Sequence, residues 1–539
     1  MARPHSLDED PSLSRSRFGH TPALWLLLPL LIGCAIDTAF QPDIKTFLIG
    51  TTIVLGGLWL CIKNEHSSLL LIFIAGIFLG AAWHQAKLFP QTKINPTRNY
   101  AELSVALSRS SSQQKESSWS GVGMVTDKGI FFRRRIALSG KGPAPIAGGE
   151  YKISGWMSTI PDRPAGFDAW IASQGCTLKL SNGKILGVLE PPGAFSEWCQ
   201  RTQSRLETWL RTLPWDDHDG GSLLAATLLG RTALLPPDAK LNFAGTGTLH
   251  LFAISGLHIA GMAAALLWLT KKFRLPEKPL GVFILILLWL YVQVTGASPS
   301  SLRAWIMAVF IWAGQISERR TPILQSLALA GAVTLILQPE ASNDPGFQLS
   351  YLAVLGIICA GAPAAEILTS PDLIERMTPK KSITLVKRWS IKIKNLLISG
   401  VCISTAATIA GTPLTLIYFQ SASWAGMFAN LILVPLSEIP LVLGMASLSL
   451  YCWDGFLPAA KWINGLAALT LDAMAWLVKL FTVIPHLVFQ TNSGAERSGQ
   501  ICVAFLVGCF LYQTESKSVI KLLGIPALIV LLWILFFVI

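Results

Sequence analysis

Apolar segments long enough to cross a lipid bilayer recur along most of this chain. A helix needs about 20 mostly apolar residues to span the hydrocarbon core. Thirteen segments approach that length: 22–40, 46–62, 68–86, 249–270, 279–295, 302–315, 323–338, 349–365, 396–418, 427–450, 464–485, 500–513 and 521–538. Two of them are short, so we expect about 11–13 membrane helices. Only 14% of the residues are charged, whereas soluble domains average about 25%. The pattern predicts a polytopic α-helical membrane protein.

Basic residues set the expected orientation of these helices. Lys and Arg gather at 271–278, 319–320 and 376–394. Cytoplasmic loops of membrane proteins carry an excess of such residues, so all three segments are expected inside the cell. Counting from a cytoplasmic N-terminus then places 87–248 and the C-terminus outside. Much of the net charge of +12 is therefore explained by the excess of Lys and Arg in cytoplasmic loops.

The chain divides into five predicted parts. These are a disordered cytoplasmic tail (1–21), a three-helix membrane region (22–87), an exported domain (88–215), a larger membrane domain (219–495) and C-terminal membrane helices (496–539). The stretch 219–247 is amphipathic, and we expect it to lie on the outer membrane surface.

The exported segment is rich in predicted strands. They are 121–125, 131–138, 150–156, 177–180 and 184–189. Ser181-Asn182-Gly183 is expected to be a hairpin turn between the last two strands. Short strands with one brief helix at 167–174 indicate a small β-barrel such as an OB-fold. From 195 to 211 the apolar period becomes helical.

This exported domain is unusually basic. Residues 87–215 contain 17 Lys and Arg against 9 Asp and Glu, an excess that membrane topology does not explain. Phe131, Phe132, Arg133, Arg134 and Arg135 place aromatic rings beside guanidinium groups. Bases stack on rings while cations meet phosphates, so these five residues are candidate DNA contacts. The alternative is an edge strand that charge keeps soluble.

Polar side chains enter the apolar run at 248–260. Thr248, His250, Ser255 and His258 lie within it, and a charged group at membrane depth costs about 2.5–3.5 kcal/mol. Such groups normally face a bundle interior or a water-filled path. Neighbouring glycines favour a broken or re-entrant helix, which is tolerated where it lines a cavity. The four residues are therefore candidates for lining a path. The alternative is that each histidine is hydrogen-bonded within the bundle.

Three later stretches add further lining candidates. These candidates are Arg303, Asp344, Gln348, Ser350 and Asn430. Arg303 is expected to begin a helix on the outer side, where it draws an anion inward or snorkels to lipid phosphate. Asp344 or Asn343 is expected to cap the next helix. Packing through small residues is the ordinary explanation for the region around Asn430.

Several catalytic signatures are absent from the sequence. It contains no Gly-x-x-x-x-Gly-Lys-Ser/Thr phosphate loop and no Gly-x-Ser-x-Gly elbow. The eight histidines form no closely spaced metal array, and the acidic loop at 216–219 is isolated. We therefore predict no enzymatic activity, no cofactor and no metal. Cys176 and Cys199, both in the exported region, are a candidate disulfide.

Four motifs in order resemble the ComEC family of competence proteins, the inner-membrane channels for incoming DNA. They are Gly-Thr-Leu-His-Leu-Phe-Ala-Ile-Ser-Gly-Leu-His-Ile (247–259), Thr-Gly-Ala-Ser-Pro-Ser-Ser-Leu-Arg-Ala (295–304), Asp-Pro-Gly-Phe-Gln-Leu-Ser-Tyr (344–351) and the Pro413–Asn430–Pro435 region. The exported domain resembles the family's OB-like domain, with Arg163–Asp168 at its Pro-Gly-Gly-Phe-Asp-like turn. Many members continue into a metallo-β-lactamase-like domain thought to degrade one strand. This chain stops at Ile539 and lacks a His-x-His-x-Asp-His array. The resemblance therefore implies a short form whose nuclease, if one acts, is a separate protein.

The resemblance implies transport of single-stranded DNA across a bacterial inner membrane during natural transformation. Moving one negative charge inward costs about 2.3 kcal/mol per 100 mV, and the chain has no visible motor. We therefore expect a cytosolic ATPase or helicase that pulls the strand and an outer DNA-binding protein that delivers it. Three rival interpretations stay open. They are a transporter of small anionic solutes, an assembly scaffold, and a membrane-embedded envelope-polymer enzyme using His250, His258 and Asp344.

Overall fold

The computed structural model describes most of the chain. The described residues are 21–40, 50–52, 54, 65–88, 99–113, 118–127, 131–160, 168, 171–172, 174–274, 276–317, 322–370, 385–423, 425–482, 488–490, 496–513, 516 and 518–537. The predicted tail apart from Thr21, most of the predicted helix at 46–62, the basic pair at 319–320 and the family-like turn at 163–167 lie outside them.

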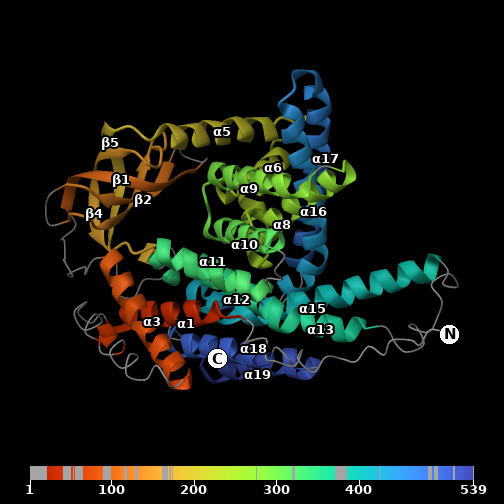
Figure 1. Ribbon diagram of the computed structural model, residues 1–539. Helices are drawn as coiled ribbons and strands as arrows, with labels where there is room; N and C mark the ends of the chain where they lie inside the picture. Colours follow the sequence, from red (N-terminus) through yellow and green to blue (C-terminus); the bar gives the residue numbers. More distant parts are fainter. Residues whose placement is uncertain are drawn as a thin grey trace, which may run out of the picture.

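Helices form most of the described structure (Figure 1). The α-helices are α1 (Leu24–Phe40), α3 (Glu65–Leu88), α5 (Ala194–Leu210), α6 (His218–Leu229), α7 (Pro237–Gly245), α8 (Gly256–Lys272), α9 (Glu277–Val294), α10 (Pro299–Ile316), α11 (Ile323–Leu337), α12 (Pro345–Gly356), α13 (Ala362–Thr369), α15 (Leu385–Phe419), α16 (Ala425–Tyr451), α17 (Leu457–Thr482), α18 (Glu496–Tyr512) and α19 (Ile525–Phe537). Shorter turns are the 3-10 helices η2 (Thr232–Leu234), η3 (Leu249–Phe252), η4 (Pro339–Asn343) and η6 (Asp454–Phe456), and the π-helices η5 (Ile357–Gly361) and η7 (Ile520–Gly524).

Four helical spans among the described residues are long and apolar enough to cross a membrane. They cover Pro345–Thr369, Val386–Phe419, Ala425–Tyr451 and Asp454–Thr482. Six shorter apolar helices accompany them in the same part of the chain. The prediction of a multi-pass helical membrane protein is confirmed.

A five-stranded barrel is inserted between α3 and α5. Its strands are β1 (Asn99–Gln113), β2 (Ser118–Val125), β3 (Arg135–Lys141), β4 (Glu150–Thr159) and β5 (Leu178–Glu190). They close in the order β1-β2-β3-β5-β4, and only β3 and β5 run parallel. Inward-facing side chains such as Val105, Ile136 and Ile153 are fully buried. Alternating apolar residues thus fill the interior, as in a small OB-like barrel, and the predicted fold of this domain is confirmed.

Two local strand predictions are wrong. The expected hairpin at 181–183 does not form, because 178–190 is one strand that pairs with β4 along its length and with β3 over its first part. Asn182 has a φ of 53°, so the left-handed residue bends the strand around the barrel instead of reversing it. Phe131–Arg133 form a turn, with Arg133 at a φ of 59°, and β3 begins only at Arg135.

The segment after α5 is also placed differently from the prediction. We expected 219–247 on the membrane surface. The later part, α7, keeps exposed side chains such as Leu241, so its placement stays a prediction. By contrast, α6 is buried from Gly220 to Leu229, with Leu224 and Leu228 at 0% exposure. It packs against α16 and α17. Its small residues, including Gly220, allow this close packing against α17. Asp217 caps the helix by accepting from the Gly220 amide, so α6 belongs to the helical core.

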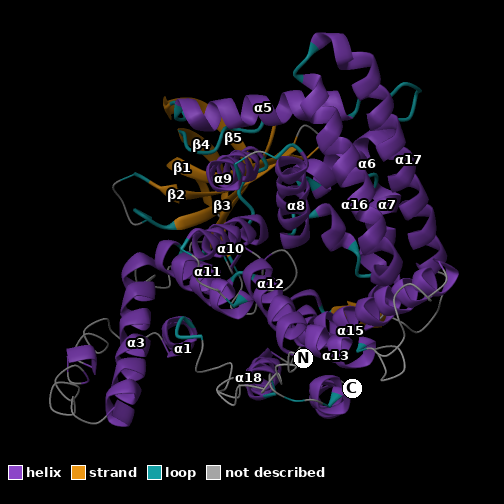
Figure 2. Ribbon diagram, turned by 45° about the vertical axis from the view of Figure 1, so that its right-hand side comes forward, coloured by secondary structure: helices purple, strands orange, loops and turns teal. Residues whose placement is uncertain are grey.

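The barrel and a basic helical segment lie at opposite ends of the molecule. In Figures 1 and 2 the barrel stands on one side of the helices, and the first part of α15 projects on the other. That part carries exposed Lys387, Arg388, Lys392 and Lys394. A short two-stranded sheet, β6 (Ser421–Ser423) with β7 (Val488–Gln490), links the segments that follow α15 and α17.

Candidate functional site

The first polar motif is a broken helix. Between α7 and α8 the chain turns at Gly247, which has a φ of 72°, and then forms the one-turn η3. The α-helix starts only at Gly256, after Ser255. The Ser255 hydroxyl accepts from the His258 amide at 3.3 Å, and His258 Nδ1 accepts from the Ser255 amide at 3.0 Å. This reciprocal capping box satisfies two amides that the break exposes. The predicted break in the helix is confirmed.

The second motif starts α10 beside this break. Gly296 and Ala297 have positive φ angles of 92° and 48°, and Ser298 caps α10 by accepting from the Ser301 amide. The Ser300 hydroxyl donates to the Ile254 carbonyl at 2.6 Å. That bond joins the start of α10 to the loop that precedes α8.

Arg303 is the centre of the arrangement. Its side chain is 3% exposed, so the snorkelling alternative is wrong. Nη1 donates to the Ser350 hydroxyl, and the guanidinium lies 5.3 Å from the centre of the Tyr351 ring. A Cβ added at Gly256 would lie 3.4 Å from Arg303 Nη2. Three predicted motifs, carried by α8, α10 and α12, therefore meet around one guanidinium.

The electrostatics of this cluster favour an anion. Among the described residues, no carboxylate pairs with Arg303, and its Nε has no hydrogen-bond partner. An unpaired buried charge is costly. The first turn of α8 adds the positive end of a helix dipole and amides without intrahelical acceptors. A buried cation beside a helix N-terminus is an arrangement that binds phosphate and similar anions.

The cluster is packed shut in this structure. Arg303, His258 and Thr248 are each at most 3% exposed. The Thr248 hydroxyl bonds the Thr246 hydroxyl at 2.7 Å, while His250 on η3 is exposed. Two hollows formed by described residues lie elsewhere, one along the start of α15 and one beside α5. These side chains therefore form a closed polar core.

Gln348 and Asn430 have no described polar contact with Arg303. Gln348 donates to the Ser342 carbonyl at 2.7 Å and accepts from the Tyr418 hydroxyl at 3.0 Å. Asn430 is half-buried on α16, and its Oδ1 has no partner among the described residues. The role of both residues in lining a path stays a prediction.

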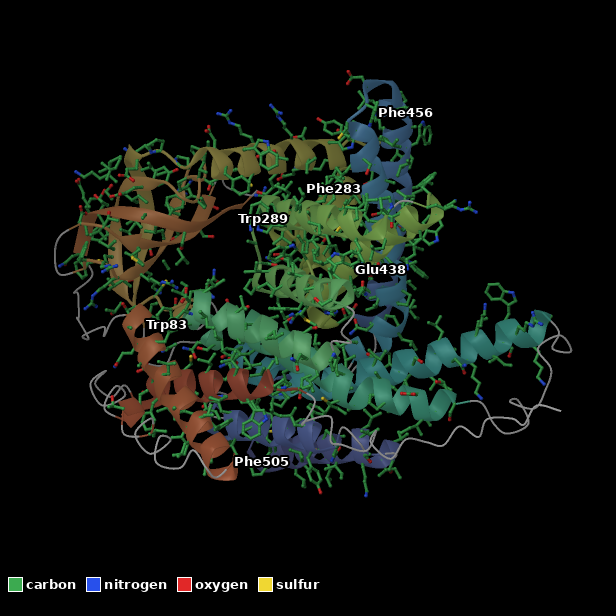
Figure 3. All side chains as sticks on the ribbon, in the orientation of Figure 1. Trp83, Phe283, Trp289, Glu438, Phe456 and Phe505 are labelled. Carbon is green, nitrogen blue, oxygen red and sulfur yellow. The ribbon has the colours of Figure 1, made fainter. Side chains whose placement is uncertain are left out.

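Glu438 is a polar group that sequence reasoning missed. It projects from α16 toward α8, where a Cβ at Gly261 would lie 2.7 Å from Glu438 Oε2 (Figure 3). Its Oε1 has no partner among the described residues. The signal was a carboxylate inside an apolar run, between Pro435 and Pro440. Carboxylates at such depth are rare and normally face a bundle interior.

The third motif also holds the barrel. Asp344, one of the two predicted capping residues, caps α12 by accepting from the Gly346 amide at 2.7 Å. The same carboxylate accepts from Gln174 of the barrel region at 2.6 Å. Arg135, at the start of β3, pairs with Glu340 of η4 at 2.5 Å. The barrel is thus fixed to the segment that begins α12, six residues before Ser350.

The aromatic and basic run at 131–135 is divided between several environments. Phe132 is 49% exposed and Arg134 is 9% exposed. Arg133 is exposed, whereas Arg135 holds Glu340 and also donates to the Gln174 carbonyl at 3.0 Å. Only Phe132 and Arg133 of this run are therefore exposed. Its contact with DNA remains a prediction.

The predicted disulfide is absent from the structure. Cys176 and Cys199 are both free thiols. Cys176 packs inside a small apolar cluster of the barrel domain with Val122, Ala137 and Ile171, whereas Cys199 lies on α5. Burial raises the pKa of Cys176 to about 12, against the opposing effect of Arg135.

The acidic loop at 216–219 forms no group of metal ligands among the described residues.

Comparison with known proteins finds one family. A family model described as "Competence protein" matches residues 227–516. ComE operon protein 3 of Bacillus subtilis is 24% identical over 327 residues, which cover 56% of this chain and 38% of the relative. Recombination protein 2 of Haemophilus influenzae is 27% identical over 258 residues, covering 45% and 31% of the two chains. Competence protein ComA of Neisseria gonorrhoeae is 29% identical over 198 residues, covering 34% and 26%.

The matched regions span between about a quarter and two fifths of these relatives' own lengths. No solved structure is significantly similar to this chain. The matched range includes α8, α10 and α12, and therefore all the side chains gathered around Arg303.

Proposed function

This chain belongs to the competence protein family, and from that premise we propose that it conducts single-stranded DNA through the bacterial inner membrane into the cytoplasm. The observation that carries the proposal is the guanidinium of Arg303, which is 3% exposed, lies near the start of α8 and has no carboxylate partner among the described residues. A strand of DNA presents one phosphate after another, each able to accept charge-assisted hydrogen bonds from such a group.

Transport requires the closed core to open. The polar contacts that hold the segments around Arg303 together are single hydroxyl bonds of Ser300 and Ser350, beside the apolar packing of α8 against α10. Each such bond contributes about 0.5–1.5 kcal/mol, or about 1.5–3 kcal/mol where one partner is charged. A phosphate entering the cluster replaces a neutral acceptor of Arg303 with an anionic one. The incoming strand itself therefore stabilises the open arrangement.

The two ends of the molecule give the proposed path a direction. The exposed cations of α15 support a cytoplasmic location for that end, and the barrel at the other end would meet DNA outside. Inward passage of each phosphate opposes the membrane potential by about 2.3 kcal/mol per 100 mV. A cytosolic ATPase or helicase would supply that work, and an outer DNA-binding protein would deliver the strand. We propose that the membrane domain and the barrel act as a conduit and carry out no catalysis themselves.

The test compares Arg303 variants in a transformable strain that lacks the native gene. Losing a charge-assisted contact of about 1.5–3 kcal/mol reduces a rate or affinity roughly 10- to 150-fold. We expect Arg303→Ala to lower transformation by this factor, with labelled DNA held outside the inner membrane. Arg303→Lys keeps the charge and should retain part of the activity.

Arg201→Ala is the matched control, because Arg201 is exposed on α5 and pairs with Glu197 of the same helix. Immunoblots of membrane fractions confirm equal amounts of each variant. Normal DNA entry with Arg303→Ala would overturn the proposal. Impaired uptake of small anions with normal DNA entry would instead favour the solute transporter.

A further inference from the structure

The outer surface of the barrel carries a pair of exposed aromatic rings. Tyr100 of β1 and Trp156 of β4 are directly opposite each other in the strand register. Their side chains are 57% and 43% exposed, with ring centroids 5.6 Å apart and nearly perpendicular. Large aromatic side chains usually fill cores or interfaces. Two of them exposed side by side on the outer face of the sheet form an aromatic surface against which a ligand outside the barrel can stack.

The Tyr100 ring is held in position by a hydrogen bond. Its hydroxyl donates to Ser154 Oγ at 2.9 Å, and Ser154 itself is 1% exposed. The ring therefore lies against the sheet without free rotation of the whole side chain. Fixing a side chain before a ligand arrives removes part of the entropic cost of binding.

Two lysines flank the rings on the same face. Lys184 of β5 lies opposite Ser154, one row along β4 from Trp156. Lys152 lies on the same strand, four residues before Trp156, and its Nζ lies 3.3 Å from Glu102 Oε2. Both lysines are exposed. Neighbouring strands are about 4.8 Å apart and alternate residues about 6.8 Å apart, so rings and ammonium groups form one continuous surface.

We propose that this aromatic–lysine face, made of Tyr100, Trp156, Lys152 and Lys184, captures the incoming single strand of DNA. The proposal rests on the function proposed above and names the place where the barrel first holds its substrate. Bases stack on the two rings without regard to sequence, and Lys184 meets a phosphate, while Lys152 can do so in exchange for Glu102. Glu102 neutralises Lys152 on this face, and Lys184 leaves a net positive charge that favours a polyanion over an apolar partner. The face is separate from 131–135, where Arg135 is engaged in holding the barrel to η4.

The experiment measures binding of a fluorescein-labelled oligothymidylate by the full chain in lipid nanodiscs. An oligomer of about 20 nucleotides exceeds the roughly 4–16 nucleotides that one OB-fold occupies. The double variant Tyr100→Ala with Trp156→Ala should weaken binding at least about tenfold, because each stacked ring accounts for about a 5- to 150-fold change in affinity. Trp156→Phe keeps a ring and should retain most of the affinity.

The lysines have a separate readout. Lys184→Gln should reduce the slope of log affinity against log salt concentration by about 0.7, the value for one phosphate contact on a single strand. Met124→Ala is the matched control for the ring variant, since Met124 is also an exposed apolar residue of the barrel, at 37%. Phe132→Ala tests the run at 131–135. Fluorescence-detected unfolding shows whether each variant remains folded.

The outcomes separate this proposal from the function on which it rests. Loss of binding in the ring variant, with normal binding by Met124→Ala and Phe132→Ala, supports the aromatic–lysine face. Unchanged binding in a folded ring variant overturns the face while leaving the conduit intact. Absence of oligothymidylate binding by the parent chain overturns the face as well. Normal DNA entry with Arg303→Ala overturns the conduit independently.

Discussion

The ion pair between Arg135 and Glu340 predicts a measurable coupling between the barrel and α12. The two side chains are 2.5 Å apart and keep 27% and 19% of their surface exposed. A hydrogen bond to a charged group contributes about 1.5–3 kcal/mol when buried, and exposed pairs contribute about 0.2–1 kcal/mol. Because this pair is mostly but not fully buried, we expect a coupling energy of about 1–2 kcal/mol.

A double-mutant cycle measures that coupling. Arg135→Ala, Glu340→Ala and the combined variant are compared by hydrogen exchange in the peptide that spans 339–350, where opening of the segment exposes the α12 N-terminus. The coupling corresponds to a roughly 5- to 30-fold change in the local opening equilibrium. Arg135→Glu combined with Glu340→Arg should restore part of the protection. Strictly additive single effects would show that the pair does not hold the barrel, and would refute the reasoning.

Two further predictions concern packing and thiol chemistry. Gly33→Ala should destabilise the α1–α3 contact by about 1–3 kcal/mol, because the added Cβ would lie 2.2 Å from the Ile77 carbonyl oxygen. Gly508→Ala, with nothing within 4 Å, is the control, and equal thermal midpoints for both would contradict the packing. Since burial raises the Cys176 pKa to about 12, its thiolate is scarce at pH 8, and maleimide should label exposed Cys452 far faster. Equal labelling rates, read by mass spectrometry, would contradict the buried thiol.

The sequence predicted the features that depend on local pattern. Apolar length identified the membrane helices, and alternation within 150–156 identified a strand of the barrel. Asp344 or Asn343 was predicted to cap a helix because such side chains can accept a hydrogen bond from a first-turn amide, and the structure contains that bond for Asp344. Glycines and polar residues around Ser255 likewise predicted a break in an apolar segment.

Features that depend on tertiary partners were not predictable in the same way. Asn182 and Gly183 can occupy either a hairpin turn or a bend in a continuous strand. Only the closure of the barrel determines that they form a bend. The amphipathic pattern of α6 does not reveal that α17 covers its second face. Arg135 looked like a phosphate contact beside its neighbours, while its actual partner, Glu340, lies 205 residues away.

The same distinction applies to the candidate site. The motifs that carry Ser255, Arg303 and Ser350 were each visible in the sequence, but their convergence on one guanidinium follows from the packing of α10 against α8 and α12. Glu438 was overlooked because a single carboxylate in an apolar run has no local motif. Its approach to Gly261 becomes evident only when α16 is placed beside α8.

Site-specific photo-cross-linking during DNA uptake tests the central claim most directly. A photoreactive amino acid replaces Leu257, which is 45% exposed in the first turn of α8 beside Gly256. A second protein carries it at Ile286, 51% exposed on α9, as the control. If the strand passes the Arg303 cluster, labelled DNA cross-links to position 257 and not to position 286. Continued DNA entry without any cross-link at 257, or equal cross-linking at both positions, would contradict the proposed path.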